Sequence, residues 1–153
     1  MALYLVQHGK NLPKDVDPDK GLSDDGAADV RRIADVAKGY TVKVDAIAHS
    51  GKKRALQTAE IFADALSPAR GVSEREGLGA LNDVADAAKN LKSEENLMLV
   101  GHLPFMEKMT GYLTAGDAEK RVFKFQNGGI VCLDADPDGD GWVVKWALMP
   151  QIG

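Results

Sequence analysis

The chain has 153 residues, of which 44% are hydrophobic and 27% are charged, and this composition is typical of one globular domain. Its net charge of −4 disfavours nucleic acid as the main partner, and its apolar runs are far shorter than the ~20 residues of a membrane span. The first residues lack a signal-peptide pattern, and the single cysteine, Cys132, cannot form an internal disulfide. We therefore expect a cytoplasmic protein that does not associate with membranes.

Strand and helix patterns alternate along the chain. Ser23 can cap a helix with its hydroxyl, and Asp24 and Asp25 suit the positive N-terminal end of that helix. In chain order, the patterns first predict a strand at 2–8, a polar loop at 11–22, a helix from Ser23 to Gly39, a strand at 44–50 and a helix at 52–66. A looser segment follows, and then a helix near 83–92 with Asn82 as a possible cap, a strand at 96–102 and a helix at 104–114 with Pro104 in its first turn. The last two predicted elements are strands at 128–135 and 142–149.

This order of elements predicts the α/β class. Strands that alternate with helices form a mainly parallel sheet with helices on both faces, and the last two strands should form an antiparallel hairpin across the turn sequence DPDGDG. Because no repeat, linker or low-complexity tract divides the sequence, we expect a single three-layer domain over residues 1–153.

The three histidines of the chain, His8, His49 and His102, each stand at the last position of a predicted strand. The C-terminal ends of parallel strands meet at one edge of a sheet, where open α/β sheets bind their ligands. His8 and His102 also adjoin a glycine, which allows backbone or a ligand to approach closely. We therefore expect a functional role for these two, whereas His49 can be either structural or supporting.

The residues expected near this edge favour an anion over a metal ion. Three histidines could hold zinc with one open position, but cations around such a site would repel the metal. A phosphoryl group instead requires cations and helix N-termini. The cations in question are Lys10, Lys20, Lys52, Lys53 and Arg54, of which Lys52 and Lys53, taken singly, are interpreted as surface charges. We expect neither a metal nor a cofactor.

These residue types allow a specific mechanism. A neutral imidazole can attack phosphorus and carry the phosphoryl group until water removes it. A backbone carbonyl in the loop after the strand could fix its tautomer. A second, protonated imidazole could face the first and bind a phosphoryl oxygen.

Three segments carry a resemblance to a known family. VQHG resembles the R-H-G signature of the histidine phosphatase (phosphoglycerate-mutase-like) superfamily, HSGKKRALQTAEIF is similar to its S-P-x-x-R-A-x-Q-T-A segment, and LMLVGHLPFM resembles its late V-G-H-x-P strand. The short length, the segment DPDKGLSDDG and the closing WALMP are similar to the SixA-like branch of phosphohistidine phosphatases.

This resemblance implies a phosphoglycerate-mutase-like fold without the inserted cap of the mutases, and therefore a shallow site that admits a protein side chain. His8 matches the phosphate-accepting nucleophile, Arg54 a phosphate-binding arginine, and His102 the second histidine of the pocket. Lys20 falls where this branch often has an arginine that reaches the phosphate.

The sequence departs from the family pattern at three positions. Gln7 replaces the arginine before the nucleophile, Lys10 replaces an acidic residue, and Gly51 replaces the proline of S-P. Gln7 can donate hydrogen bonds to phosphate but brings no charge, and Lys10 could restore that charge as a less directional cation. An active enzyme with a rearranged pocket, a slow enzyme and a phosphate-binder without turnover all stay open.

The general acid and the substrate are not fixed by the sequence. Asp17, Asp19 and Asp83 are candidate acids by loop position alone, and each is otherwise a solvated loop charge. The leading hypothesis is a metal-independent phosphatase acting on phosphohistidine in a phosphorylated protein, because a leaving imidazole needs less acid help than an alkoxide. The alternatives are a phosphatase for small phosphorylated molecules, a non-catalytic phosphate-binding or interaction module, and a histidine-metal hydrolase.

Overall fold

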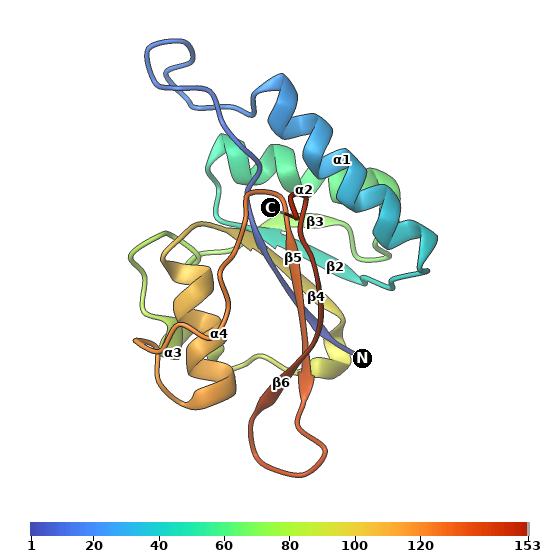
Figure 1. Cartoon of the computed structure of the whole chain (residues 1–153), viewed down its shortest axis with the longest axis vertical. Coiled ribbons are helices and arrows are strands. Elements are labelled where there is room, and N and C mark those ends of the chain that lie inside the picture. Colours follow the sequence, from blue (N-terminus) through green and yellow to red (C-terminus); the bar gives the residue numbers. More distant parts are fainter. Residues whose placement is uncertain (153) are drawn as a thin grey trace.

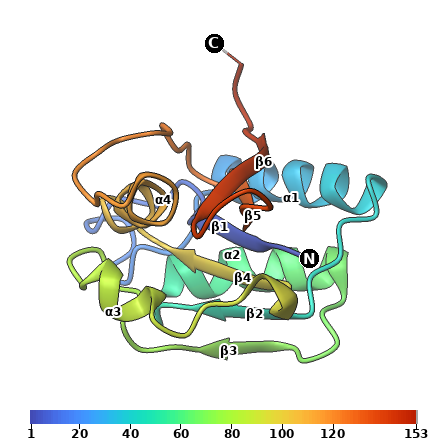
Figure 2. The same cartoon turned by 90° about the horizontal axis from the view of Figure 1, so that it is seen from below.

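Six strands form one mixed sheet in the computed structural model of the protein, which describes residues 1–152. The strand order is β3-β2-β4-β1-β5-β6, as Figures 1 and 2 show. The strands are β1 (Leu3–Gln7), β2 (Ala46–His49), β3 (Val72–Glu74), β4 (Leu97–Gly101), β5 (Ile130–Ala135) and β6 (Trp142–Leu148). The pairs β1–β4, β4–β2 and β2–β3 are parallel, and β1–β5 and β5–β6 are antiparallel. The predicted α/β class and the closing hairpin are confirmed.

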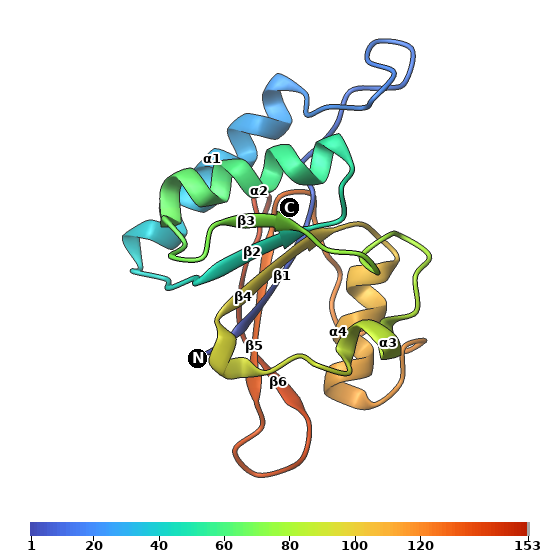
Figure 3. The same ribbon diagram turned by 180° about the vertical axis from the view of Figure 1, so that it is seen from behind.

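Helices cover both faces of this sheet. Figure 3 shows α1 (Asp24–Gly39) and α2 (Lys53–Leu66) on one side, and α3 (Val84–Ala88) and α4 (Phe105–Ala115) on the other. A short 3₁₀ helix (Ser93–Glu95) precedes β4.

Strand β1 is buried on both faces because it lies between β4 and β5 in the middle of the sheet. Tyr4 and Val6 belong to the core beneath α1 and α2, whereas Leu3 and Leu5 belong to the core beneath α4. This alternation follows from the two-residue period of a strand, and it explains why the run reads as continuously apolar.

The register places the ends of three strands at one edge. Gln7, the last residue of β1, pairs with Gly101, the last residue of β4, and His49 at the end of β2 pairs with Val100. All three histidines were predicted to be the last residue of a strand. The structure shows this for His49 alone, because His8 and His102 each follow their strand by one residue. The predicted gathering of the strand ends at one edge is confirmed.

Several boundaries differ from the prediction. Strand β3 lies in the segment predicted to be loose, because its three residues are half-buried or exposed and give no apolar run. Helix α3 is shorter than predicted, since Val84 is its only buried residue and little packing extends it. Its cap is Asp83, whose side chain accepts the N–H of Ala85, and not Asn82, which accepts the N–H of Gly79.

The described residues include no helix that is both long enough and apolar enough to span a membrane.

Candidate functional site

Two imidazoles face each other at the C-terminal edge of β1 and β4. The ring centroids of His8 and His102 are 5.1 Å apart, and the ring planes meet at 55°. The two residues are only 9% and 4% exposed. The backbone N–H of His8 donates to the carbonyl of Gly101 at 2.9 Å, which extends the β1–β4 pairing by one residue and fixes both loops.

The hydrogen bond of the His8 ring defines its tautomer. Nδ1 lies 2.7 Å from the carbonyl oxygen of Gly9. Since a carbonyl oxygen can only accept, Nδ1 carries the proton and Nε2 of the neutral ring has a free lone pair. Burial lowers the pKa of His8 below 6.5, and the nearby Arg54 guanidinium lowers it further against the opposing effect of the Gly9 bond. His8 is therefore neutral at pH 7, as a nucleophile must be, and the predicted carbonyl partner is confirmed.

Two other residues, Thr58 and Asn127, hold the loop of His8. The N–H of Gly9 donates to Thr58 Oγ1 at 2.9 Å, and that hydroxyl donates to the carbonyl of Arg54 at 2.8 Å. From the other side, Asn127 Nδ2 donates to the carbonyl of His8 at 2.9 Å. The loop after β1 is thus tied both to α2 and to the segment before β5.

The glycines next to the two histidines make room for protein atoms. A Cβ on Gly9 would lie 2.7 Å from Val30 Cγ2 in α1. A Cβ on Gly101 would lie 2.8 Å from Met106 Cε in α4. Glycine at each position therefore lets a helix pack closely against the end of a strand.

His102 has a side-chain partner. Its Nε2 lies 2.6 Å from Ser50 Oγ, at the end of β2. Burial, followed by repulsion from His8 when it is protonated and from the charges of Arg54 and Lys52, lowers the pKa of His102 to about 4. The ring is therefore neutral at pH 7 in this structure, and a protonated second imidazole stays a prediction for the site with a phosphoryl group bound.

Helix α2 supplies the positive charge of the site. Arg54 is half-buried in its first turn, and its charge acts on both imidazoles. The N-terminus of α2 has no side-chain cap and no acidic residue in its first turn. The positive end of the helix and the guanidinium therefore act in the same place, which favours an anion.

Gln7 lies beside His8 and is also 9% exposed. Its Oε1 is buried and is the one such side-chain N or O atom without a hydrogen-bond partner in the part of the chain that the structure describes. An unpaired buried acceptor typically costs about 1–3 kcal/mol. The position thus holds a polar side chain at a cost in stability, next to the proposed nucleophile.

Lys20 and Lys10 occupy different surroundings. The loop that carries Lys20 is bound to α2, because the N–H of Leu22 donates to Gln57 Oε1 at 2.7 Å and Lys53 Nζ pairs with Asp17 Oδ2 at 2.9 Å. Lys20 itself is half-buried with a φ of 52°. Lys10 is exposed and lines a neighbouring pocket in front of α1. The structure brings His8, Arg54 and His102 together, whereas Lys10 lines the neighbouring pocket.

The remaining histidine has a local role. His49 Nδ1 accepts the N–H of Gly51 at 3.1 Å. Gly51 has a φ of 94°, which a proline ring excludes, so the glycine that departs from the family pattern suits the turn found here. Within residues 1–152 no three His, Cys, Asp or Glu side chains gather as metal ligands, so the three histidines do not converge on one point.

The candidate acids are engaged or exposed. The hydrogen bond from Lys53, with further bonds from the N–H groups of Gly21 and Asp19, lowers the pKa of Asp17 to about 2. An ionised carboxylate of this kind has no proton to donate at pH 7. Asp83 caps α3, and Asp19 is exposed.

Sequence reasoning missed four residues that act on the two imidazoles or on the loop of His8. Ser50 and Thr58 were seen only as matches to the family segment, and Lys52 was interpreted as a surface charge. Asn127 gave no signal, because it lies 119 residues from His8 along the chain.

Known proteins resemble this chain in both sequence and fold. Residues 3–81 match the family described as the histidine phosphatase superfamily (branch 1). Phosphohistidine phosphatase SixA of Escherichia coli (strain K12) is 24% identical over 156 residues, which cover 98% of this chain and 94% of that protein.

Solved structures extend this result. The protein histidine phosphatase SixA complexed with tungstate superposes with a TM-score of 0.83 at 23% identity, covering 98% of this chain and 97% of that one. The putative SixA of Agrobacterium tumefaciens has a TM-score of 0.74 at 24% identity and 97% coverage of both chains. Phosphoserine phosphatase of Entamoeba histolytica has a TM-score of 0.69 at 18% identity and 95% coverage of both. The chain therefore belongs to the histidine phosphatase superfamily, as its motifs indicated, and has the phosphoglycerate-mutase-like fold of SixA.

Proposed function

We propose that this protein is a metal-independent phosphatase that carries the phosphoryl group on Nε2 of His8. The observation that carries the proposal is the 2.7 Å bond between His8 Nδ1 and the Gly9 carbonyl. That bond leaves the lone pair of Nε2 available in a ring that is neutral at pH 7, next to a guanidinium and a second imidazole. A free lone pair on a neutral imidazole is what nucleophilic attack on phosphorus requires.

The reaction has two steps. Nε2 of His8 attacks phosphorus, the bond from phosphorus to the leaving atom breaks, and the leaving group takes up a proton. Water then attacks the phosphoryl group on His8, releases inorganic phosphate and restores the neutral ring. Arg54 and the N-terminus of α2 stabilise the charge on the three phosphoryl oxygens in both steps.

His102 is the second ring of the proposed pocket. Its pKa of about 4 keeps it neutral in this structure, with Nε2 on the hydroxyl of Ser50. A phosphoryl dianion between the two rings would raise that pKa, because an opposite charge at close range favours the imidazolium. We infer that His102 gains its proton only when the phosphoryl group binds.

The proposed substrate is phosphohistidine in a protein. Asp17 is ionised at pH 7 and Asp83 caps α3, so neither is assigned as a general acid for an alkoxide, whereas a leaving imidazole needs little help. Curated and structural relatives named as phosphohistidine phosphatases support the same choice.

The test compares two substrates and one variant. Purified protein is given a phosphohistidine-carrying protein and an aryl phosphate, each with and without chelator, beside His8→Ala. We expect chelator-resistant phosphate release that is faster from phosphohistidine and absent in the variant, and a phosphoryl mass on the peptide that contains His8. Faster release from the aryl phosphate would assign a small phosphoester substrate instead. Loss of activity with chelator would show that the enzyme depends on a metal ion.

Gln7 favours a second candidate, a phosphate-binding module without turnover. The neutral amide lacks the guanidinium of the family pattern, and loss of one such donor typically costs ~10²–10³ in rate. If the missing guanidinium is the limiting defect, Gln7→Arg should raise turnover. Binding of inorganic phosphate without hydrolysis of either substrate, in both the wild type and Gln7→Arg, would support the binding module. A fall in turnover on Gln7→Arg would show that Gln7 and Lys10 form a different working arrangement.

A further inference from the structure

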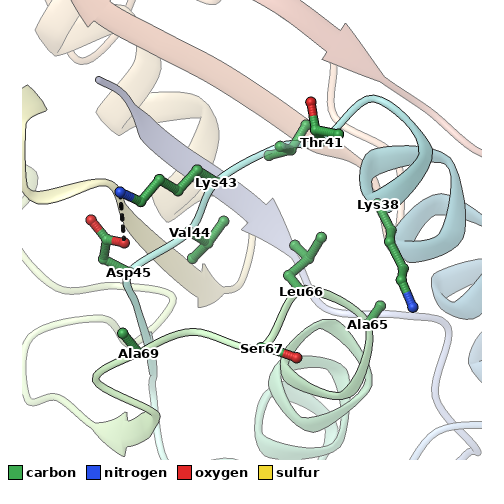
Figure 4. Close-up of a pocket in the computed structure, with 10 residues that line it drawn as sticks. Lys38, Thr41, Lys43, Val44, Asp45, Ala65, Leu66, Ser67 and Ala69 are labelled. Carbon is green, nitrogen blue, oxygen red and sulfur yellow. Dashed lines mark ion pairs between the residues drawn. The ribbon is translucent and has the colours of Figure 1, made fainter.

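Cavities lie at both ends of the parallel strands, and one of them is lined by Asn127, which donates to the His8 carbonyl. Figure 4 shows a cavity of about 460 Å³ between the end of α1, the segment before β2 and the end of α2. Its Lys43 and Asp45 are 3.9 Å apart and pair with each other. Because β2 begins there and ends at the histidine edge, this cavity is remote from the site.

A second cavity, here named the Lys10–Lys124 pocket, lies at the histidine edge. It has a volume of about 430 Å³. Its lining residues are Lys10, Asp29, Lys124, Phe125, Gln126, Asn127, Pro150 and Gln151. Two of these connect it to the nucleophile, since Lys10 is two residues beyond His8 and Asn127 donates to the His8 carbonyl at 2.9 Å.

Hydrogen bonds fix the walls of this pocket. Gln126 Nε2 donates to the carbonyl of Gln151 at 2.9 Å, and the N–H of Gln151 donates back to Gln126 Oε1 at 2.9 Å. Arg32 donates to the carbonyl of Pro150 at 2.7 Å and to Asp29 at 3.0 Å. The C-terminal segment is therefore held against both the loop before β5 and α1, and the pocket is formed before any ligand binds.

The charges of the pocket are unbalanced. Its one carboxylate, Asp29, is paired with Arg32. Lys10 and Lys124 are both exposed, and neither forms an ion pair within residues 1–152. In a protein with a net charge of −4, two uncompensated ammonium groups beside the nucleophile favour an anionic ligand.

We propose that the Lys10–Lys124 pocket binds a carboxylate on the surface of the phosphoprotein, next to the phosphohistidine that enters the site. This inference rests on the proposed function. A ligand that fills both places must carry a phosphoryl group to His8 and an acidic side chain to Lys124, and a folded protein surface presents two such groups at fixed positions. A small phosphorylated imidazole reaches only the first.

The test uses charge reversal at the position outside the phosphoryl site. Lys124→Glu is compared with Lys92→Glu, which makes the same change in net charge on an exposed lysine before β4, at the opposite edge of the sheet. The substrates are an acidic phosphohistidine-carrying domain, the same domain with the carboxylates around its histidine replaced by amides, and free phosphoimidazole. Each variant is first compared with the wild type by thermal unfolding, and Lys124→Ala provides a milder second variant.

We expect Lys124→Glu to raise KM for the acidic domain about three- to tenfold at low salt, with kcat unchanged, and the effect to fade at high salt. Turnover of phosphoimidazole, and KM for the amide domain, should not change. An equal effect of Lys92→Glu, or an equal effect on phosphoimidazole, would overturn the proposal.

Binding of the phosphorylated domain is also measured in the His8→Ala background. That measurement stands even if no substrate is hydrolysed, so failure of the proposed function and failure of the pocket are separate results. Loss of affinity on Lys124→Glu in that background, restricted to the acidic domain, supports the pocket, and unchanged affinity rejects it.

Discussion

His8 and His102 are both buried, but they are held by different kinds of hydrogen bond. The ring of His8 donates to the backbone carbonyl of the next residue, Gly9, within its own loop. The ring of His102 contacts the side chain of Ser50, which lies 52 residues away at the end of another strand. A backbone acceptor persists through almost any substitution, whereas a hydroxyl is removed by a single one.

This difference suits the two proposed roles. A nucleophile needs one tautomer at all times, and a carbonyl partner enforces it. The second ring must change protonation state when a dianion arrives, and a hydroxyl can either donate to it or accept from it. The comparison predicts that substitutions around His8 act on the fold as well as on catalysis, and that substitutions around His102 act mainly on catalysis.

Arg54→Met removes the charge that acts on both rings and should have the largest effect. We expect kcat to fall by ~10²–10³, because one preset charged donor to the phosphoryl oxygens is lost. The pKa values of His8 and His102 should both rise, since Arg54 lowers each of them. Steady-state kinetics and NMR titration of the rings measure the two effects.

Two variants control the loss of Arg54. Arg54→Lys keeps a charge without the fork and should recover part of the rate. Arg31→Met removes an exposed arginine that pairs with Asp64 and should leave the rate unchanged. If only one of the two ring pKa values moves in Arg54→Met, the guanidinium does not serve both imidazoles.

Acidification should reveal the second-largest effect. Both imidazoles have pKa values below 6.5 in the folded protein, chiefly because of burial, and His102 has one of about 4. The unfolded chain, with histidine pKa values near 6.5, therefore binds more protons between about pH 4 and 6.5, so stability is complete above 6.5 and decreases as the pH falls through that window. The value of kcat/KM should likewise fall about tenfold per pH unit below the pKa of His8.

Urea unfolding at pH 7.5 and 5, and a pH–rate profile corrected for titration of the substrate, check this prediction. His102→Gln should weaken the pH dependence of stability. The fall of kcat/KM below the pKa of His8 should remain in this variant. An increase of kcat/KM as the pH falls through 6.5 would mean that the free enzyme needs a protonated His102, against the neutral ring found here.

The comparison also shows what the sequence could predict. The positions of His8, His49 and His102 at strand ends followed from short apolar runs that stop at a polar residue, and the carbonyl partner of His8 followed because it lies within the same loop. The bond from Ser50 to His102 depends on the neighbouring positions of β2 and β4, and that from Asn127 to His8 on the path of the chain before β5. Such contacts follow from packing between distant segments, which local periodicity does not encode.

The sequence also did not show which charged side chains lie close enough to the two imidazoles to change their pKa values. Lys52 is an exposed lysine by pattern and by accessibility, yet its charge lowers the pKa of His102. The unpaired oxygen of Gln7 emerges only when all its neighbours are in place.

Thr58→Val tests the His8 side of the comparison. Thr58 is fully buried, and its hydroxyl accepts the N–H of Gly9 while donating to the carbonyl of Arg54. Valine keeps the shape and leaves that buried N–H unpaired, so we expect a loss of about 1–3 kcal/mol in the free energy of unfolding. Rate should fall as well, because Gly9 also carries the carbonyl that orients His8.

Helix α4 contains a matched control for this variant. Thr110 is also fully buried and donates to the carbonyl four residues earlier, that of Met106, at 2.8 Å. Thr110→Val therefore removes a hydroxyl-to-carbonyl bond within the helix, but it leaves no backbone N–H unpaired as Thr58→Val does at Gly9. Urea unfolding of both variants isolates the difference, and equal losses would mean that the Gly9 N–H contributes little.

Ser50→Ala tests the His102 side and should have the smallest effect. The hydrogen bond between a half-buried hydroxyl and a neutral ring contributes about 0.5–1.5 kcal/mol, so kcat/KM should fall roughly two- to tenfold while the free energy of unfolding barely changes. Ser50→Thr retains the hydroxyl and should stay close to the wild type.

Ser23→Ala gives the opposite pattern, because Ser23 caps α1 and its loss should cost about 1 kcal/mol of stability with no loss of rate. A collapse of activity in Ser50→Ala, far beyond tenfold, would place the hydroxyl on the reacting phosphoryl group itself, and the two imidazoles would then differ in chemistry as well as in how they are held.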